Sequence, residues 1–194
     1  MSNISVNLIK ELRDMTGVSV MQCKKALEES NGDKEKALIV LRKKSTEIAA
    51  KKGDRELGSG AVGSYLHSTG TSGAMVLLLS ETDFVAKNEE FRKLAYDIAM
   101  HVVAFNPKYL KFEDIPAEDI ERAKEVFSGE VEGKTEEMKE KIVSGKINAY
   151  FKEQVLLDQS FVKNPDITVA GLIDQAVQKF GERIEVGQFV RLSA

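Results

Sequence analysis

Few side chains in this sequence could perform covalent chemistry. The chain has two histidines, His67 and His101, and a single cysteine, Cys23. The histidines lie far apart in the sequence, and neither has the partners at fixed spacing that a catalytic or zinc site requires. Cys23 falls on the apolar face of an expected helix, where a cysteine acts as a small core residue; a reactive thiol is the minority interpretation. The sequence therefore predicts neither an enzyme nor a metal site.

Binding of nucleotides, nucleic acids or membranes by this chain itself is also disfavoured. No GxxxxGK[ST] loop is present, and the glycines of residues 58–63 precede an expected strand, whereas a dinucleotide fingerprint follows one. Lys and Arg form no long run, and the isoelectric point is about 5.6. No apolar run approaches the ~18 residues of a membrane span, and the N-terminus lacks signal-peptide features. We expect a cytoplasmic protein without a cofactor.

The formal net charge of −3 is unevenly distributed along the chain. Residues 1–55 have a net charge of +4, whereas residues 56–194 have a net charge of −7. This asymmetry is consistent with a basic head that meets an acidic partner, and equally with an ordinary solvated surface.

Two short segments contain apolar residues that suit a contact with a partner. In the first, residues 16–21 (TGVSVM), Met21 shares a helix face with charged residues and is a candidate contact residue, while Val20 is expected on the inner face with Cys23. In the second, residues 81–85 (ETDFV), Phe84 stands beside Asp83 in a short strand-to-helix connection. Such a phenylalanine either folds onto the core or projects as a binding anchor, and spacing alone favours the core.

Three short helices are expected to position the first segment. Residues 5–16 have apolar side chains at helical spacing, namely Leu8, Ile9, Leu12 and Met15, and Gly17 follows as a helix terminator. Ser19 and Gln22 form a capping box for the second helix, and Asp33 caps the third after Gly32. Residues 51–60 are polar and glycine-rich, so we expect a linker there and two domains, residues 1–54 and 55–194.

The second segment is expected to lie in an α+β domain. Strands are predicted at residues 61–67, 74–80 and 184–192, with hairpin residues at 68–73. Asn88 caps a long helix with a regular apolar stripe, and further helices are predicted at 116–127, 135–144, 146–157 and 168–180. The expected architecture is a small antiparallel three-stranded sheet with helices packed on one face.

The order of these motifs resembles that of bacterial elongation factor Ts, the nucleotide-exchange factor for elongation factor Tu. The resemblance covers nearly the whole chain. It rests on Leu12-Arg13, Thr16-Gly17, Cys23-Lys24-Lys25-Ala26-Leu27, Gly32-Asp33 and Lys36-Ala37, on residues 81–88 (ETDFVAKN) with Phe91, and on Val155-Leu156-Leu157, Gln159 and Phe161-Val162-Lys163.

The chain departs from the family in two respects. The family commonly has two methionines where this chain has Val20 and Met21, so the first contact methionine is a valine here. The chain also resembles the short form of the family, which has one core subdomain where longer members have two. This likeness implies a homodimer.

The resemblance implies a fold and a mechanism of exchange. The three-helix head would be similar to a ubiquitin-associated domain and would dock on elongation factor Tu, GDP-bound or nucleotide-free, through Arg13, Val20 and Met21. The magnesium-dislocation loop, which comprises Thr82, Asp83, Phe84 and Val85, would enter the partner beside its Mg²⁺ and phosphate site. The alternative is a protein-interaction module unrelated to translation, but a generic scaffold has no need for the ETDFV loop.

Overall fold

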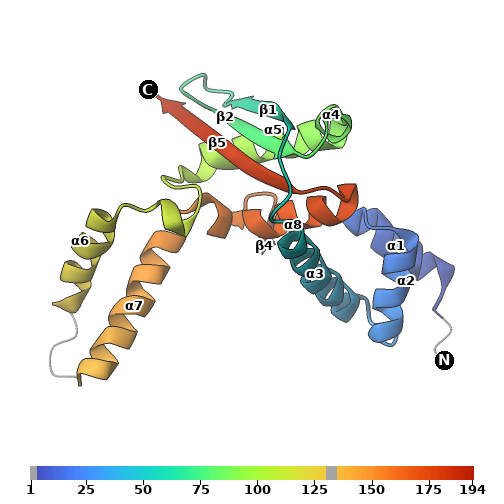
Figure 1. Ribbon diagram of the computed structural model, residues 1–194, viewed down its shortest axis with the longest axis horizontal. Coiled ribbons are helices and arrows are strands. Elements are labelled where there is room, and N and C mark those ends of the chain that lie inside the picture. The colour runs from blue at the N-terminus through green and yellow to red at the C-terminus, as the bar shows by residue number, and fades with distance from the viewer. Residues whose placement is uncertain (1–3, 130–134) are drawn as a thin grey trace.

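The computed structural model describes residues 4–129 and 135–194 (Figure 1). Three helices are followed by a β-hairpin, a long helix, a helical hairpin, a small ribbon, and a last helix and strand. In chain order the elements are α1 (Val6–Thr16), α2 (Val20–Glu29), α3 (Lys34–Lys51), β1 (Ser59–Leu66), β2 (Ser72–Ser80), α4 (Asp83–Ala86), α5 (Glu89–Phe105), η1 (Phe112–Asp114), α6 (Ala117–Ser128), α7 (Glu136–Lys152), η2 (Leu156–Asp158), β3 (Ser160–Phe161), β4 (Asn164–Thr168), α8 (Val169–Phe180) and β5 (Ile184–Ser193).

The first three helices form a small unit with its own apolar core. The predicted caps Ser19 and Asp33 are confirmed, because each side chain accepts a backbone N–H of the helix that follows. Ser5 caps α1 in the same way, which the sequence analysis did not predict. Gly17 ends α1 with φ 68°, in the left-handed region that a glycine adopts without steric cost. The core consists of Leu12, Val18, Cys23, Ala26, Leu27, Ala37 and Leu41.

Helix α3 extends beyond this unit and packs against α8. The Ser45 hydroxyl hydrogen-bonds Gln178, and the Thr46 hydroxyl donates to Asp174 over 2.7 Å. The helix continues to Lys51 and β1 begins at Ser59, so the connecting segment is shorter than the expected linker of residues 51–60. The head is thus joined to the rest of the molecule by a continuous helix.

The predicted antiparallel three-stranded sheet is confirmed, with the strand order β1-β2-β5. Helix α5 covers one face and buries its predicted stripe, including Phe91, Ala95, Ile98 and Val102. The close approach of α5 to β1 requires Gly63, where a Cβ atom would lie only 2.2 Å from the backbone carbon of Ala95. Strand β1 begins two residues earlier than expected.

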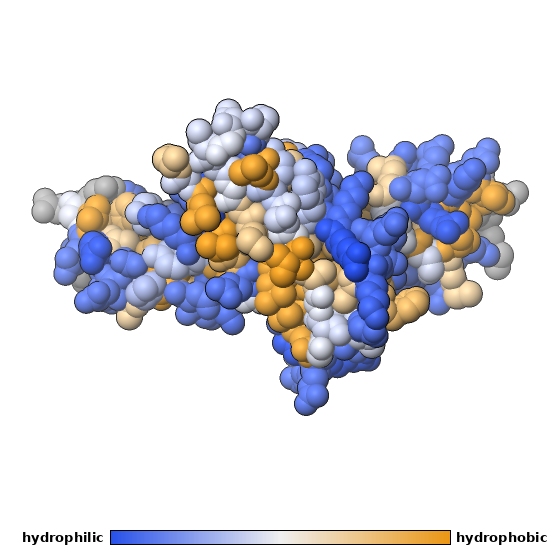
Figure 2. Space-filling model, turned by 90° about the horizontal axis from the view of Figure 1, so that it is seen from above, coloured by the Kyte–Doolittle hydropathy of each residue, from blue (hydrophilic) through white to orange (hydrophobic). Residues whose placement is uncertain are grey.

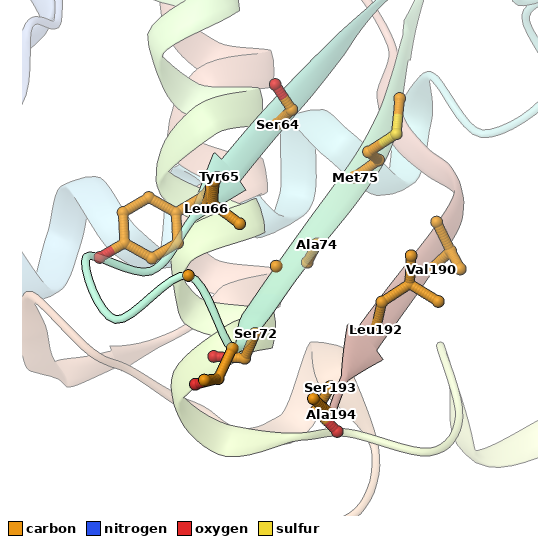
Figure 3. A pocket seen from close by; sticks show the side chains of 13 residues that line it. Ser64, Tyr65, Leu66, Ser72, Ala74, Met75, Val190, Leu192, Ser193 and Ala194 are labelled. Atoms are coloured by element: carbon orange, nitrogen blue, oxygen red, sulfur yellow. The ribbon is translucent and has the colours of Figure 1, made fainter.

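The opposite face of the sheet, which we call the open sheet face, is apolar and uncovered. Seen from above, hydrophobic side chains gather over the middle of the molecule, where the sheet lies (Figure 2). Strand pairing aligns Met75 of β2 with Ser64 of β1 and Val190 of β5. A hollow of about 530 Å³ opens there (Figure 3). The exposed apolar residues of the open sheet face are Val62, Leu66, Met75, Val190 and Leu192.

One expectation for the second half of the chain is wrong, and one small element was not predicted. Residues 135–144 and 146–157 do not form two helices, because α7 continues through Gly145, which faces solvent. A glycine inside a helix costs only ~1 kcal/mol, and the buried residues Val143, Ile147 and Phe151 maintain one face across it. The ribbon of β3 and β4 was not expected, since β3 has only two residues.

In the described residues, no helix is both long enough and apolar enough to cross a membrane.

Candidate functional site: an exposed loop beside a three-helix head

Residues 82–85, named the magnesium-dislocation loop here after the role that the resemblance implies, overlap a single helical turn, α4, where the sequence predicted only a tight connection. Val85 and Ala86 are buried at 4% and 6% exposure, and they attach the turn to the sheet and α5. Phe84 points the other way, because its side chain is 81% exposed. The expectation that Phe84 folds onto the core is therefore wrong: Val85 and Ala86 already occupy the core-facing positions.

Asp83 gives the loop a negative charge next to this aromatic ring. Its carboxylate accepts a hydrogen bond from the Lys87 ammonium over 2.6 Å, and this bond holds the pKa of Asp83 below its usual range. A hollow of about 540 Å³ beside α4 is lined in part by Asp83, Lys87 and Arg92. The loop thus presents an apolar anchor and a charged rim together.

Polar contacts from other segments of the chain hold Glu81 and Thr82 at the start of the loop. Glu81 pairs with Arg55 at 3.0 Å and accepts the backbone N–H of Arg183 at 2.5 Å. Partial burial raises the pKa of Glu81, but the bonds from Arg183 and Arg55 outweigh it and leave the pKa below its usual value. Glu182 accepts hydrogen bonds from both the backbone N–H and the hydroxyl of Thr82. Sequence reasoning missed these supports because Arg55 lies 26 residues from Glu81, and Glu182 and Arg183 lie about a hundred residues further along the chain.

The head presents a second exposed apolar group around the Gly17 turn. Met21 is 69% exposed, which confirms its predicted position outside the core. Val20, expected on the inner face, is 51% exposed, because it is the first residue of α2 and Val18 fills the core in its place. Met15, grouped by its helical spacing with Leu8, Ile9 and Leu12, is 59% exposed at the end of α1 and is a contact candidate that sequence reasoning missed.

Arg13 adds a positive charge to this part of the head. Its side chain is exposed in the last turn of α1, and its backbone carbonyl accepts the Gly17 N–H. The group formed by Arg13, Met15, Val20 and Met21 is called the head patch below.

Helices α1 and α2, which carry the head patch, and α4 lie at the same end of the molecule, opposite α6 and α7 (Figure 1). Lys179 of α8 lies between the segments that carry the head patch and the loop. Its ammonium binds Glu90, in the first turn of α5, at 2.6 Å. A Cβ atom at Gly17 would lie 3.1 Å from the same ammonium nitrogen. A single partner could therefore contact both groups.

The residues suited to covalent chemistry have structural positions. Cys23 is fully buried, and burial raises the pKa of its thiol despite the hydrogen bond with Thr16 and the charge of Arg13. His101 is also buried, where its Nδ1 accepts the Val162 N–H and its Nε2 bonds the Gln159 side chain. Within residues 4–129 and 135–194, no group of three or more His, Cys, Asp or Glu side chains could hold a metal ion.

Known proteins match nearly the whole length of this chain. A family model described as elongation factor TS matches residues 39–194. The chain is 48% identical over 192 residues to elongation factor Ts of Thermosipho melanesiensis, covering 98% of each chain. It is 49% identical over 189 residues to elongation factor Ts of Thermodesulfovibrio yellowstonii, covering 97% of this chain and 94% of the relative. The matched residues include the magnesium-dislocation loop and, in these relatives, most of the head as well. The chain therefore belongs to the elongation factor Ts family.

Proposed function

We propose that the chain acts as a translation elongation factor that binds elongation factor Tu·GDP and promotes GDP release, so that GTP can rebind. Membership of the elongation factor Ts family supports this activity. The observation that carries the residue-level proposal is the exposure of Phe84, at 81%, on a loop attached through buried Val85. We place the activity in the cytoplasm and expect no covalent step and no direct contact with nucleic acid.

Phe84 is the proposed wedge of the exchange step. An exposed aromatic side chain on a supported loop can enter a partner pocket at little cost in conformational entropy. Asp83 and Thr82 would then stand beside the partner's Mg²⁺, which bridges the nucleotide phosphates to protein oxygens. Disturbing the groups that hold Mg²⁺ weakens GDP binding. Because the coupling of two binding events is reciprocal, GDP weakens binding of the factor by the same ratio.

The head is the proposed docking domain. Residues 1–54 would supply affinity through the head patch, whereas residues 55–194 would supply the loop and the dimer interface. Methionine side chains are flexible and polarisable, so Met15 and Met21 suit contact with an irregular partner surface. The positive charge of Arg13 suits an acidic region of that partner.

We further propose a homodimer formed through the open sheet face. Leu66, Met75 and Leu192 are 70%, 51% and 73% exposed on neighbouring strands. An uncharged apolar patch that spans three strands is typical of the core of a protein interface. A second copy of the same face would cover it.

The direct test is release of a fluorescent GDP analogue from elongation factor Tu, followed by stopped flow with excess unlabelled nucleotide. Substoichiometric chain should accelerate release, since the factor leaves once nucleotide rebinds. The chain alone should neither bind nor hydrolyse GTP. Unaccelerated release, or GTP hydrolysis by the chain alone, would reject the proposal.

A further inference from the structure

The carboxylate of Glu182 holds the start of the magnesium-dislocation loop by two hydrogen bonds. One oxygen accepts the backbone N–H of Thr82 at 3.0 Å, and the other accepts the Thr82 hydroxyl at 2.6 Å. Glu182 lies in the turn between α8 and β5, a hundred residues further along the chain. Both oxygens of a half-buried carboxylate are thus committed to one residue of the loop.

The loop needs such external support because α4 is too short to be stable alone. The helix comprises only Asp83–Ala86, and a single turn has an unfavourable nucleation free energy. Thr82 is its N-cap, but the Thr82 side chain makes no capping hydrogen bond and is bound to Glu182. Phe84 adds nothing to the attachment, since it is largely exposed.

The neighbours of Glu182 fix the turn itself to the surrounding elements. The carbonyl of Gly181 accepts the Lys52 ammonium at 2.5 Å, and Lys179 binds Glu90. The Phe180 ring packs edge-on against Phe91, with ring centroids 6.1 Å apart. Glu182 therefore projects from a turn that is bonded to the C-terminal end of α3 and to α5. These contacts define the position of Glu182 independently of the loop.

We propose that Glu182 is a positioning residue for nucleotide exchange, which acts through Thr82 to hold Phe84 and Asp83 in the orientation that enters the partner. This inference rests on the proposed function. A flexible loop would still reach the partner, but the entropy cost of ordering the loop would offset part of the free energy of its contacts with the partner. Loss of the two hydrogen bonds should therefore reduce the exchange step more than docking.

The test compares Glu182→Ala, Glu182→Gln and Glu56→Ala in a titration of GDP release from elongation factor Tu. Glu182→Ala should lower the rate at saturating factor by about tenfold and change the half-maximal concentration little. Glu182→Gln should restore most of the rate, because its amide can accept the Thr82 N–H and donate to the Thr82 hydroxyl. Glu56→Ala removes the same charge from an exposed residue just before β1 and should match the parent chain.

A second pair of measurements keeps the inference independent of the folding of any one variant. Thr82→Val should reduce the saturating rate, and adding Glu182→Ala to it should reduce the rate little further, since the two residues act through one contact. The chain contains no tryptophan, so Phe84→Trp introduces a single reporter. Its fluorescence anisotropy in the free chain should fall when Glu182→Ala is added.

The outcomes separate this inference from the proposed function. An unchanged saturating rate for Glu182→Ala, a change confined to the half-maximal concentration, or a glutamine variant as slow as the alanine variant would overturn it. Additive effects of Thr82→Val and Glu182→Ala would overturn it as well. If the parent chain fails to accelerate release, the proposed function fails, and the anisotropy still decides whether Glu182 orders the loop.

Discussion

Phe84 and Val85 are adjacent in α4, yet their side chains occupy opposite environments: Phe84 is 81% exposed and Val85 only 4%. Val85 packs with Ala86 into the main core and attaches the turn, while Phe84 remains available to a partner. The loop thus divides attachment and contact between neighbouring residues. Truncation of Val85 should therefore lower the stability of the chain, whereas truncation of Phe84 should lower its exchange activity.

Val85→Ala should destabilise the chain, whereas Phe84→Ala should not. Removing the buried methyl groups of Val85 should lower the free energy of unfolding by about 2 kcal/mol. Truncating the exposed Phe84 should change it by less than about 0.5 kcal/mol. Urea unfolding followed by circular dichroism measures both values. A large loss for Phe84→Ala would mean that its ring packs against the chain in solution.

Truncation of the head patch should weaken docking and spare the exchange step. Met21→Ala and Met15→Ala should each raise the factor concentration for half-maximal GDP release and leave the saturating rate nearly intact. Met138→Ala is the matched control, because Met138 is 54% exposed on α7 at the far end of the molecule. A lower saturating rate for Met21→Ala would show that the head takes part in exchange itself.

The charge of Asp83 should matter separately from its shape. Asp83→Asn keeps the size of the side chain but removes the negative charge proposed to act near the partner's Mg²⁺, so release at saturating factor should slow. Lys87→Met removes the ion-pair partner of Asp83 and leaves the carboxylate in place, so it should slow release less. Stopped-flow release with each variant gives the comparison. Equal rates for Asp83→Asn and the parent chain would assign the effect to shape alone.

His101 should make stability depend on pH. Burial lowers the pKa of His101, and the hydrogen bond with Gln159 offsets this only in part. The folded chain therefore favours the neutral ring, whose Nδ1 accepts the Val162 N–H. Stability is complete above the unfolded-state pKa near 6.5 and falls as the pH decreases toward the lower folded-state value.

Urea midpoints at pH 7.5 and 5.5 measure this dependence. The midpoint of the parent chain should fall at pH 5.5 by more than that of His101→Gln, which cannot titrate. His67→Gln is the matched control and should keep the fall of the parent chain, since His67 is a half-buried hairpin residue whose ring bonds the neighbouring Thr69 and lies outside the core clusters. An equal fall for the parent and His101→Gln would assign the dependence to other groups.

A charge on the open sheet face should prevent dimerisation. The parent chain should sediment at about twice 21.5 kDa at micromolar concentration. Met75→Lys and Leu192→Lys should sediment as monomers, because a lysine on this face would be buried without a partner charge. Val126→Lys places the same charge on exposed α6 and should remain dimeric. A parent chain that sediments as a monomer would contradict the proposed interface.

Local signals in the sequence predicted most of the elements correctly. The caps Ser19, Asp33 and Asn88 each accept a backbone N–H as expected, and the apolar stripe of α5 is buried. These features depend on residues within one or two helical turns, so pattern alone identifies them. Gly145 does not end a helix as expected, because the apolar face of α7 continues past it to Phe151.

The exposure of the site residues could not be predicted in the same way. Spacing placed Val20 and Phe84 against a core and grouped Met15 with the apolar residues of the first helix. Each of the three lies at the end of a helix or in a single helical turn, and its side chain is exposed. The support from Glu182 and Arg183 depends on the tertiary fold. The sequence itself indicated Met21 as a candidate contact residue, but only the resemblance to the elongation factor Ts family favoured a contact role for Phe84 over a place in the core.

The measurement that tests the central proposal most directly is the GDP release rate as a function of factor concentration for the parent chain and Phe84→Ala. If Phe84 is the wedge, its truncation costs ~2 kcal/mol or more, as for other interface anchors. Release at saturating Phe84→Ala should then be about thirtyfold slower than with the parent chain. A variant that reaches the parent's saturating rate at a higher concentration would contradict the proposal and make Phe84 a docking residue only.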